Sequence, residues 1–115
     1  MTPMGLSGQY VQQKKFVEAM QIIRDHYRNN PQSRIAIIYR KGLESLQHNI
    51  FRYLSAEMCC YDIIRENKIS VLTVERAKGL EFEHVLVFEN KMTPNEKYGS
   101  FTRALETLTV TELLC

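Results

Sequence analysis

The sequence contains no tryptophan and only three cysteines, Cys59, Cys60 and Cys115. These cysteines form no C-x-x-C pair, so the sequence supports neither a zinc site nor a disulfide framework. Adjacent cysteines such as Cys59 and Cys60 rarely bond to each other, which favours reduced thiols. No apolar run approaches the roughly 20 residues of a membrane span. Residues 1–10 also lack the features of a signal peptide. We therefore predict a cytoplasmic protein with no membrane partner.

The sequence also has no large excess of positive or negative charge. The 115 residues include 15 Lys plus Arg and 13 Asp plus Glu, for a net charge of +2. This surplus is too small to indicate nucleic-acid binding, which needs a clustered basic face. The hydrophobic share of 44% and the charged share of 24% are typical of an ordinary globular domain. We expect residues 1–10 to be a flexible entry segment and residues 11–115 to form one domain.

A phosphate-binding loop is absent too. The pattern G-x-x-x-x-G-K-[ST] does not occur, and no paired acidic motif for Mg²⁺ follows a predicted strand. Because that loop holds the β- and γ-phosphates, the chain is not expected to hydrolyse ATP alone. His26, His48 and His84 have no metal-ligand spacing, so we predict no metal site. No arrangement of Ser, Cys and His indicates nucleophilic catalysis.

What is present is an alternation of helical and strand patterns. Short apolar runs rich in β-branched residues indicate strands covered on both faces, and apolar residues three or four apart indicate helices between them. This order predicts an α/β fold, a mostly parallel sheet with helices on both faces, whose ligands bind at the carboxyl ends of the strands. The predicted helices are 11–28, 43–54 and one that begins at Pro94 and aligns Tyr98, Phe101, Leu105 and Leu108; the predicted strands are 34–39, 69–74, 84–88 and 108–114, with one or two short strands within 55–67.

The most informative segment is residues 73–82, T-V-E-R-A-K-G-L-E-F. It lies between two predicted strands, so its polar groups should emerge at an edge of the sheet, where Gly79 lets the backbone turn closely past a ligand. Lys78 can contact a phosphate, and Glu81 can accept hydrogen bonds from a hydroxyl. A solvated connection with an ordinary Lys and Glu explains these residue types equally well.

Residues 73–83 resemble the fifth conserved motif of UvrD/Rep-type superfamily 1 helicases. That motif is commonly T-V-H-x-A-K-G-L-E-F followed by an acidic residue, here Glu83, and a hydrophobic strand. Two further segments follow in the family's order. Residues 35–40, I-A-I-I-Y-R, are similar to the fourth motif, and residues 98–104, Y-G-S-F-T-R-A, are similar to the sixth, whose core is Y-V-x-x-T-R-A.

The resemblance implies a RecA-like second motor domain that closes over ATP and Mg²⁺ held mainly by an N-terminal motor domain. It implies that Arg40 and Arg103 reach the γ-phosphate as arginine fingers, an effect of about 10³ or more in rate. Glu81 would approach the ribose of the nucleotide. Lys78 and Gly79 would also lie at the cofactor.

The resemblance also implies a track for single-stranded DNA, which Thr73 and Arg76 would contact, chiefly through phosphates. Without the resemblance, Arg40 fits a surface arginine at a strand end, and Arg103 fits a charge on the polar face of a helix. Tyr98 and Phe101 are both expected to pack against the core.

Three departures from the family pattern bear on function. Glu75 stands where the family usually has His, and its carboxylate does not favour a DNA phosphate. Gly99 replaces a residue that is commonly apolar in the family. Only residues 89–95 separate the strand after the fifth motif from the segment that leads into the sixth. This short connection resembles a compact branch of the family that lacks an inserted domain at this point.

The leading hypothesis is the C-terminal motor domain of a UvrD-like DNA helicase or translocase, inactive by itself. The alternative is a non-catalytic helicase-like module that docks a repair or transcription protein.

Overall fold

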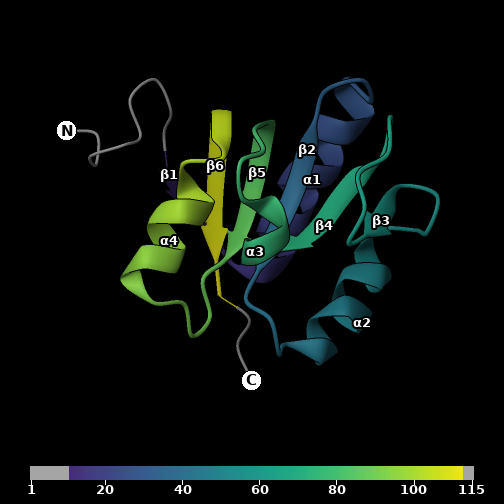
Figure 1. Ribbon diagram of the computed structural model, residues 1–115. Coiled ribbons are helices and arrows are strands. Elements are labelled where there is room, and N and C mark those ends of the chain that lie inside the picture. The colour runs from purple at the N-terminus through teal and green to yellow at the C-terminus, as the bar shows by residue number, and fades with distance from the viewer. Residues whose placement is uncertain (1–10, 113–115) are drawn as a thin grey trace.

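The structure, a computed structural model, describes residues 11–112, which form a parallel sheet covered by helices on both faces (Figure 1). The strands are β1 (Val11–Gln13), β2 (Ile35–Tyr39), β3 (Cys59–Tyr61), β4 (Ile69–Thr73), β5 (Phe82–Phe88) and β6 (Ala104–Thr111), and the helices are α1 (Phe16–Asn29), α2 (Glu44–Tyr53), α3 (Val74–Ala77) and α4 (Pro94–Phe101). The six-stranded sheet has the order β1-β6-β5-β2-β4-β3, and all of these pairings are parallel. The predicted fold class is confirmed.

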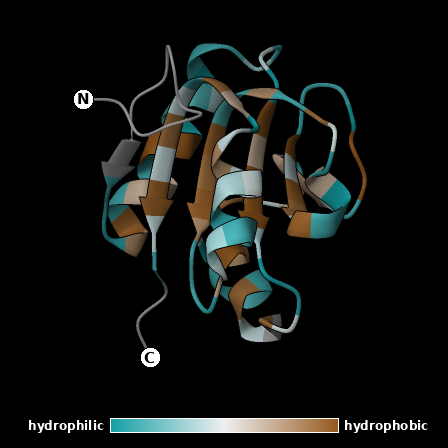
Figure 2. Cartoon of the chain, turned by 60° about the vertical axis from the view of Figure 1, so that its left-hand side comes forward, coloured by the Kyte–Doolittle hydropathy of each residue, from teal (hydrophilic) through white to brown (hydrophobic). Residues whose placement is uncertain are grey.

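The sheet has two separate cores because successive residues of a strand point to opposite faces. In β2, Ile35 and Ile37 pack in the core under α1 and α2, whereas Ala36 and Ile38 pack in the core under α3. All five residues of β2 are buried. A strand covered on both faces must be apolar throughout, which explains its unbroken apolar run. Figure 2 shows hydrophobic residues concentrated on the central strands.

The start of the first helix differs from the prediction. Residues 11–13 form β1 rather than helix, and they pair with Leu108–Val110 of β6. The Lys14 N–H continues this pairing by donating to the Val110 carbonyl at 2.9 Å, and α1 begins only at Phe16. A strand of three residues carries too little pattern to be read from the sequence. The predicted entry segment, residues 1–10, lies outside the described residues.

The last helix and strand also differ from the prediction. The helical alignment of apolar residues from Tyr98 to Leu108 is wrong, because α4 ends at Phe101 and β6 begins at Ala104. Thr102 ends the helix with its N–H and its Oγ1, which donate to the Tyr98 carbonyl at 3.1 and 2.9 Å. The strand then pairs with β5 on one side and β1 on the other. Residues 113–114 of the predicted strand lie outside the described residues.

Two smaller expectations had different outcomes. One short strand, β3, forms within residues 55–67. Phe101 packs against the core under α3, as expected, but Tyr98 is 57% exposed, so its predicted packing is wrong. The helices of residues 11–112 are at most 14 residues long, and none has the length and apolar character needed to cross a membrane.

Candidate functional site

The short helix α3 follows β4 directly and carries the central motif. Thr73 caps its first turn, since its Oγ1 accepts a hydrogen bond from the Arg76 N–H at 3.3 Å. After Lys78, Gly79 has a φ of 79°, a left-handed conformation that favours glycine. Thr73 therefore caps the start of α3, and Gly79 allows the chain to turn after it.

A groove of about 570 Å³ beside α3 brings together residues that are far apart in the sequence. Lys78, Gly79 and Arg103, three of the predicted nucleotide-site residues, all line it. We call it the α3–α4 groove, because both helices contribute to it. Its full lining is Val74, Glu75, Lys78, Gly79, Asn95, Glu96, Gly99 and Arg103.

Arg103 lies in the turn between α4 and β6, not on a helical face. Its Nη2 donates to Thr102 Oγ1 at 3.4 Å, but its Nε is buried and has no hydrogen-bond partner among residues 11–112. A buried donor without a partner costs about 1–3 kcal/mol, and more for a charged group. Arg103 also lines the groove, so its side chain lies beside any anion bound there. The side chain therefore fits the phosphate contact that the resemblance implies.

Arg40 reaches the same region through Glu96. Arg40 follows β2 directly, and its Nε lies 3.4 Å from Glu96 Oε1. Glu96 also closes a capping box at the start of α4: its Oε1 accepts the Thr93 N–H at 2.9 Å, and its own N–H donates to Thr93 Oγ1 at 3.2 Å. The backbone hydrogen bond from Thr93, with a smaller effect of Arg40, holds the pKa of Glu96 below its usual value. Arg40 does not itself line the groove, but it forms an ion pair with Glu96, which does.

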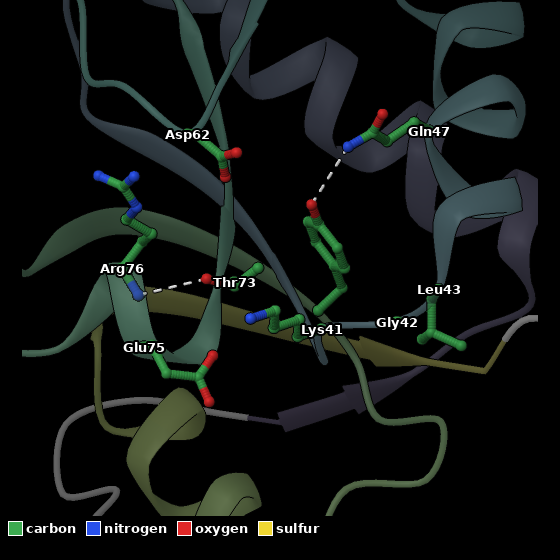
Figure 3. Close-up of a pocket in the computed structure, with 9 residues that line it drawn as sticks. Lys41, Gly42, Leu43, Gln47, Asp62, Thr73, Glu75 and Arg76 are labelled. Atoms are coloured by element: carbon green, nitrogen blue, oxygen red, sulfur yellow. Dashed lines mark hydrogen bonds between the residues drawn. The ribbon is translucent and has the colours of Figure 1, made fainter.

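A second pocket, of about 450 Å³, adjoins the first through Glu75, which lines both (Figure 3). Both predicted DNA contacts, Thr73 and Arg76, line this pocket, which we call the α2–α3 pocket. It lies at the carboxyl ends of β2 and β4, where parallel sheets bind ligands. Its charged groups balance, with cations at Lys41 and Arg76 and carboxylates at Asp62 and Glu75. Its lining is Tyr39, Lys41, Gly42, Leu43, Gln47, Asp62, Thr73, Glu75 and Arg76.

Glu81 lines neither of these sites. It is exposed and borders a smaller cavity of about 310 Å³, together with Gly79 and Arg34. Gly79 also lines the α3–α4 groove, so the two cavities meet at this glycine. The contact between Glu81 and a ribose stays a prediction.

Two structural roles were missed in the sequence. Glu83, noted only as the acidic residue of the motif, accepts hydrogen bonds from the N–H and Nη2 of Arg34, both at 2.7 Å. These bonds from Arg34 hold the pKa of Glu83 below its usual value and join the start of β2 to β5. Glu96 was not noted at all, although the spacing T-x-x-E from Thr93 is the signal of a capping box.

Two of the three histidines form an unexpected pair. The rings of His26 on α1 and His84 on β5 stack with centroids 3.7 Å apart and planes 10° apart. Thr107 Oγ1 lies 2.8 Å from His84 Nδ1 and 3.5 Å from His26 Nε2. Burial lowers the pKa of both imidazoles. Within the described part of the chain, no three side chains of the metal-binding types come together in a way that could hold an ion.

The parallel sheet, its two helical layers and the polar cavities around α3 define an α/β domain of the RecA-like kind. Among solved structures, the chain is similar to the C-terminal domain of a possible DNA helicase from Lactobacillus plantarum WCFS1. The TM-score is 0.59 and the sequence identity 21%, over 94% of this chain and 74% of that one. This likeness shows a shared fold. No family model matches the chain, and no curated protein matches its sequence.

Proposed function

We propose that this chain is the C-terminal motor domain of a UvrD-like, superfamily 1 DNA helicase or translocase driven by ATP. One observation carries the proposal: Lys78, Gly79 and Arg103 meet in the α3–α4 groove, and Glu96, which also lines it, pairs with Arg40. The order of the three motif resemblances and the fold shared with a helicase domain support it.

In this proposal an N-terminal motor domain would hold ATP and Mg²⁺, and hydrolysis of the ATP would supply the energy. This chain contributes guanidinium groups, whose planar donors match the oxygens of a phosphate. Arg103 lines the α3–α4 groove, and the Arg40 side chain is 42% exposed and can change partner. The chain lacks a phosphate-binding loop, so these residues act on a nucleotide held from the other side.

The α2–α3 pocket is the proposed contact with single-stranded DNA. Thr73 and Arg76 line it and can bind phosphates without reading the base sequence, and Lys41 adds a second cation. Glu75 lines both this pocket and the α3–α4 groove. A shift of α3 would therefore affect both sites at once, and this is the proposed link between nucleotide and DNA.

The test is the DNA-stimulated ATPase of the full-length protein that carries this domain. Arg103→Ala should lower turnover by about 10³, because the arginine acts on charge in the transition state. Arg28→Ala is the matched control, since Arg28 is exposed on α1 and lines none of the cavities described above. A full-length protein without G-x-x-x-x-G-K-[ST] before this domain would also contradict the proposal.

One observation favours the alternative of a docking module. Asp62 and Glu75 place two carboxylates in the pocket proposed for DNA, beside its two cations. Affinity for single-stranded DNA as a function of salt separates the two functions. A motor domain should bind weakly and lose affinity as salt rises, because bound phosphates release counterions. A docking module should show no DNA binding at any salt concentration.

A further inference from the structure

The charges that line the α3–α4 groove cancel one another. Lys78 and Arg103 supply two cations, and Glu75 and Glu96 supply two carboxylates. A phosphate that enters the groove therefore meets repulsion as well as attraction. Glu96 matters most among these groups, because it also pairs with Arg40, the second predicted arginine finger.

Within this ion pair, the carboxylate is the fixed partner. Glu96 Oε1 accepts the Thr93 N–H at 2.9 Å, a shorter contact than its 3.4 Å distance from Arg40 Nε. The Glu96 side chain is 22% exposed and that of Arg40 is 42% exposed. Glu96 thus stays with the first turn of α4, and Arg40 is the group that can leave.

We infer that Glu96 is a positioning residue that acts through Arg40: its carboxylate competes with a phosphate for the guanidinium and keeps Arg40 neutralised until a phosphate replaces it. This inference rests on the proposed function, because it concerns the phosphate contact of the same groove. The competition requires a charged carboxylate; a Glu carboxyl is ionised at neutral pH even at its ordinary pKa, and the Thr93 N–H lowers the pKa of Glu96 further. Glu96 would therefore reduce binding of stray anions and set the affinity at which a polyphosphate engages Arg40.

The test uses Glu96→Gln in this chain, with inorganic tripolyphosphate as the probe. Glutamine also serves in capping boxes, so the variant removes the charge and keeps an oxygen for the Thr93 N–H. Glu89→Gln is the matched control. This substitution removes the same charge as Glu96→Gln. Glu89 Oε1 lies 3.6 Å from Lys97 Nζ, and Glu89 does not line the α3–α4 groove. Thermal unfolding of each variant shows whether the fold is kept.

We expect Glu96→Gln to bind tripolyphosphate about three- to tenfold more tightly than the original chain, the range for removing one nearby charge at a partly exposed site. The control should gain less than half as much. Adding Arg40→Ala to Glu96→Gln should abolish the gain. In the original chain, the Nε–Hε resonance of Arg40 should shift as tripolyphosphate binds.

Four results would overturn the inference: equal gains for Glu96→Gln and Glu89→Gln, a gain that persists with Arg40→Ala, no binding by Glu96→Gln at millimolar tripolyphosphate, or an Arg40 resonance that stays in place while the ligand binds. A different result would contradict the proposed function: unchanged ATPase turnover when Arg103 is replaced by alanine in the full-length protein with Glu96 intact. The two failures can therefore be told apart.

Discussion

The two faces of the sheet are covered in different ways. On one face, α1 and α2, of 14 and 10 residues, bury large side chains such as Phe88, Met20 and Leu46. On the other face, α3 and α4 have four and eight residues, and the core beneath α3 contains small residues such as Ala36 and Ala77 (Figure 1). The longer helices bury the larger side chains, whereas the shorter ones flank the α3–α4 groove with its charged side chains. Most of the largest fully buried side chains thus lie on the face opposite to the α3–α4 groove.

The largest effect on stability is expected on the face of α1 and α2. Phe88 is fully buried there, with its ring 5.6 Å from that of Phe16. Phe88→Ala should lower the free energy of unfolding by about 3–5 kcal/mol, because it removes buried apolar surface and leaves a cavity. Urea denaturation measures this loss. A loss below about 1 kcal/mol would show that this face is not the main source of stability.

The face of α3 and α4 can be probed with one substitution at two glycines. Gly79→Ala should destabilise the fold by about 1–2 kcal/mol, because the φ of 79° is unfavourable for a residue with a Cβ. Gly99→Ala should stabilise it by up to about 1 kcal/mol, because Gly99 lies within α4 and a Cβ there meets no atom within 4 Å. Thermal unfolding of the two variants compares them directly. Changes of the same sign would contradict this account of the turn.

The smallest effect is a pH dependence on the face of α1 and α2. The pKa values of His26 and His84 lie below 6.5, chiefly because of burial, while the carboxylates of Asp25, Glu83 and Glu106 oppose this shift. The unfolded chain therefore binds more protons than the folded chain. The free energy of unfolding should fall as pH drops below about 6.5, and it should level off once the pH is below the lowered pKa values of the folded chain.

Urea denaturation at several pH values measures this dependence. His26→Gln should flatten the curve between pH 7 and 5, since it removes one member of the stacked pair. His48→Gln is the control, because His48 is exposed on α2. An equally steep curve for His26→Gln would show that the pair does not govern the effect.

The sequence predicted those elements whose signal is local. The runs that became β2, β4 and β5 are apolar at nearly every position because both faces of the sheet are covered. β1 and the early start of β6 depend on pairing between distant segments. The local patterns of both segments predict helix instead of strand. Leu105, aligned with Leu108 in the predicted helix, is 40% exposed in the strand, whereas Leu108 is buried.

The candidate site divides in the same way. The motif identified Lys78 and Gly79 together, because they are neighbours in one turn. That Arg103 meets them in the groove follows from the packing of α4 beside α3, which sequence spacing does not specify. The role of Glu96 depends on a contact with Arg40 across 56 positions of the chain (96 − 40). The stacking of His26 on His84 is also a long-range contact with no local signal.

The most direct test of the central claim is the ATPase turnover of the full-length protein with Arg103 replaced by alanine. The account predicts a loss of about 10³ in turnover, with nucleotide affinity much less affected, because the proposed role of Arg103 is to stabilise charge that develops during the reaction. Arg28→Ala, at an exposed arginine of α1, should retain turnover near that of the original protein. Turnover that is unchanged by Arg103→Ala would contradict the assignment of the α3–α4 groove as half of an ATP-driven motor site.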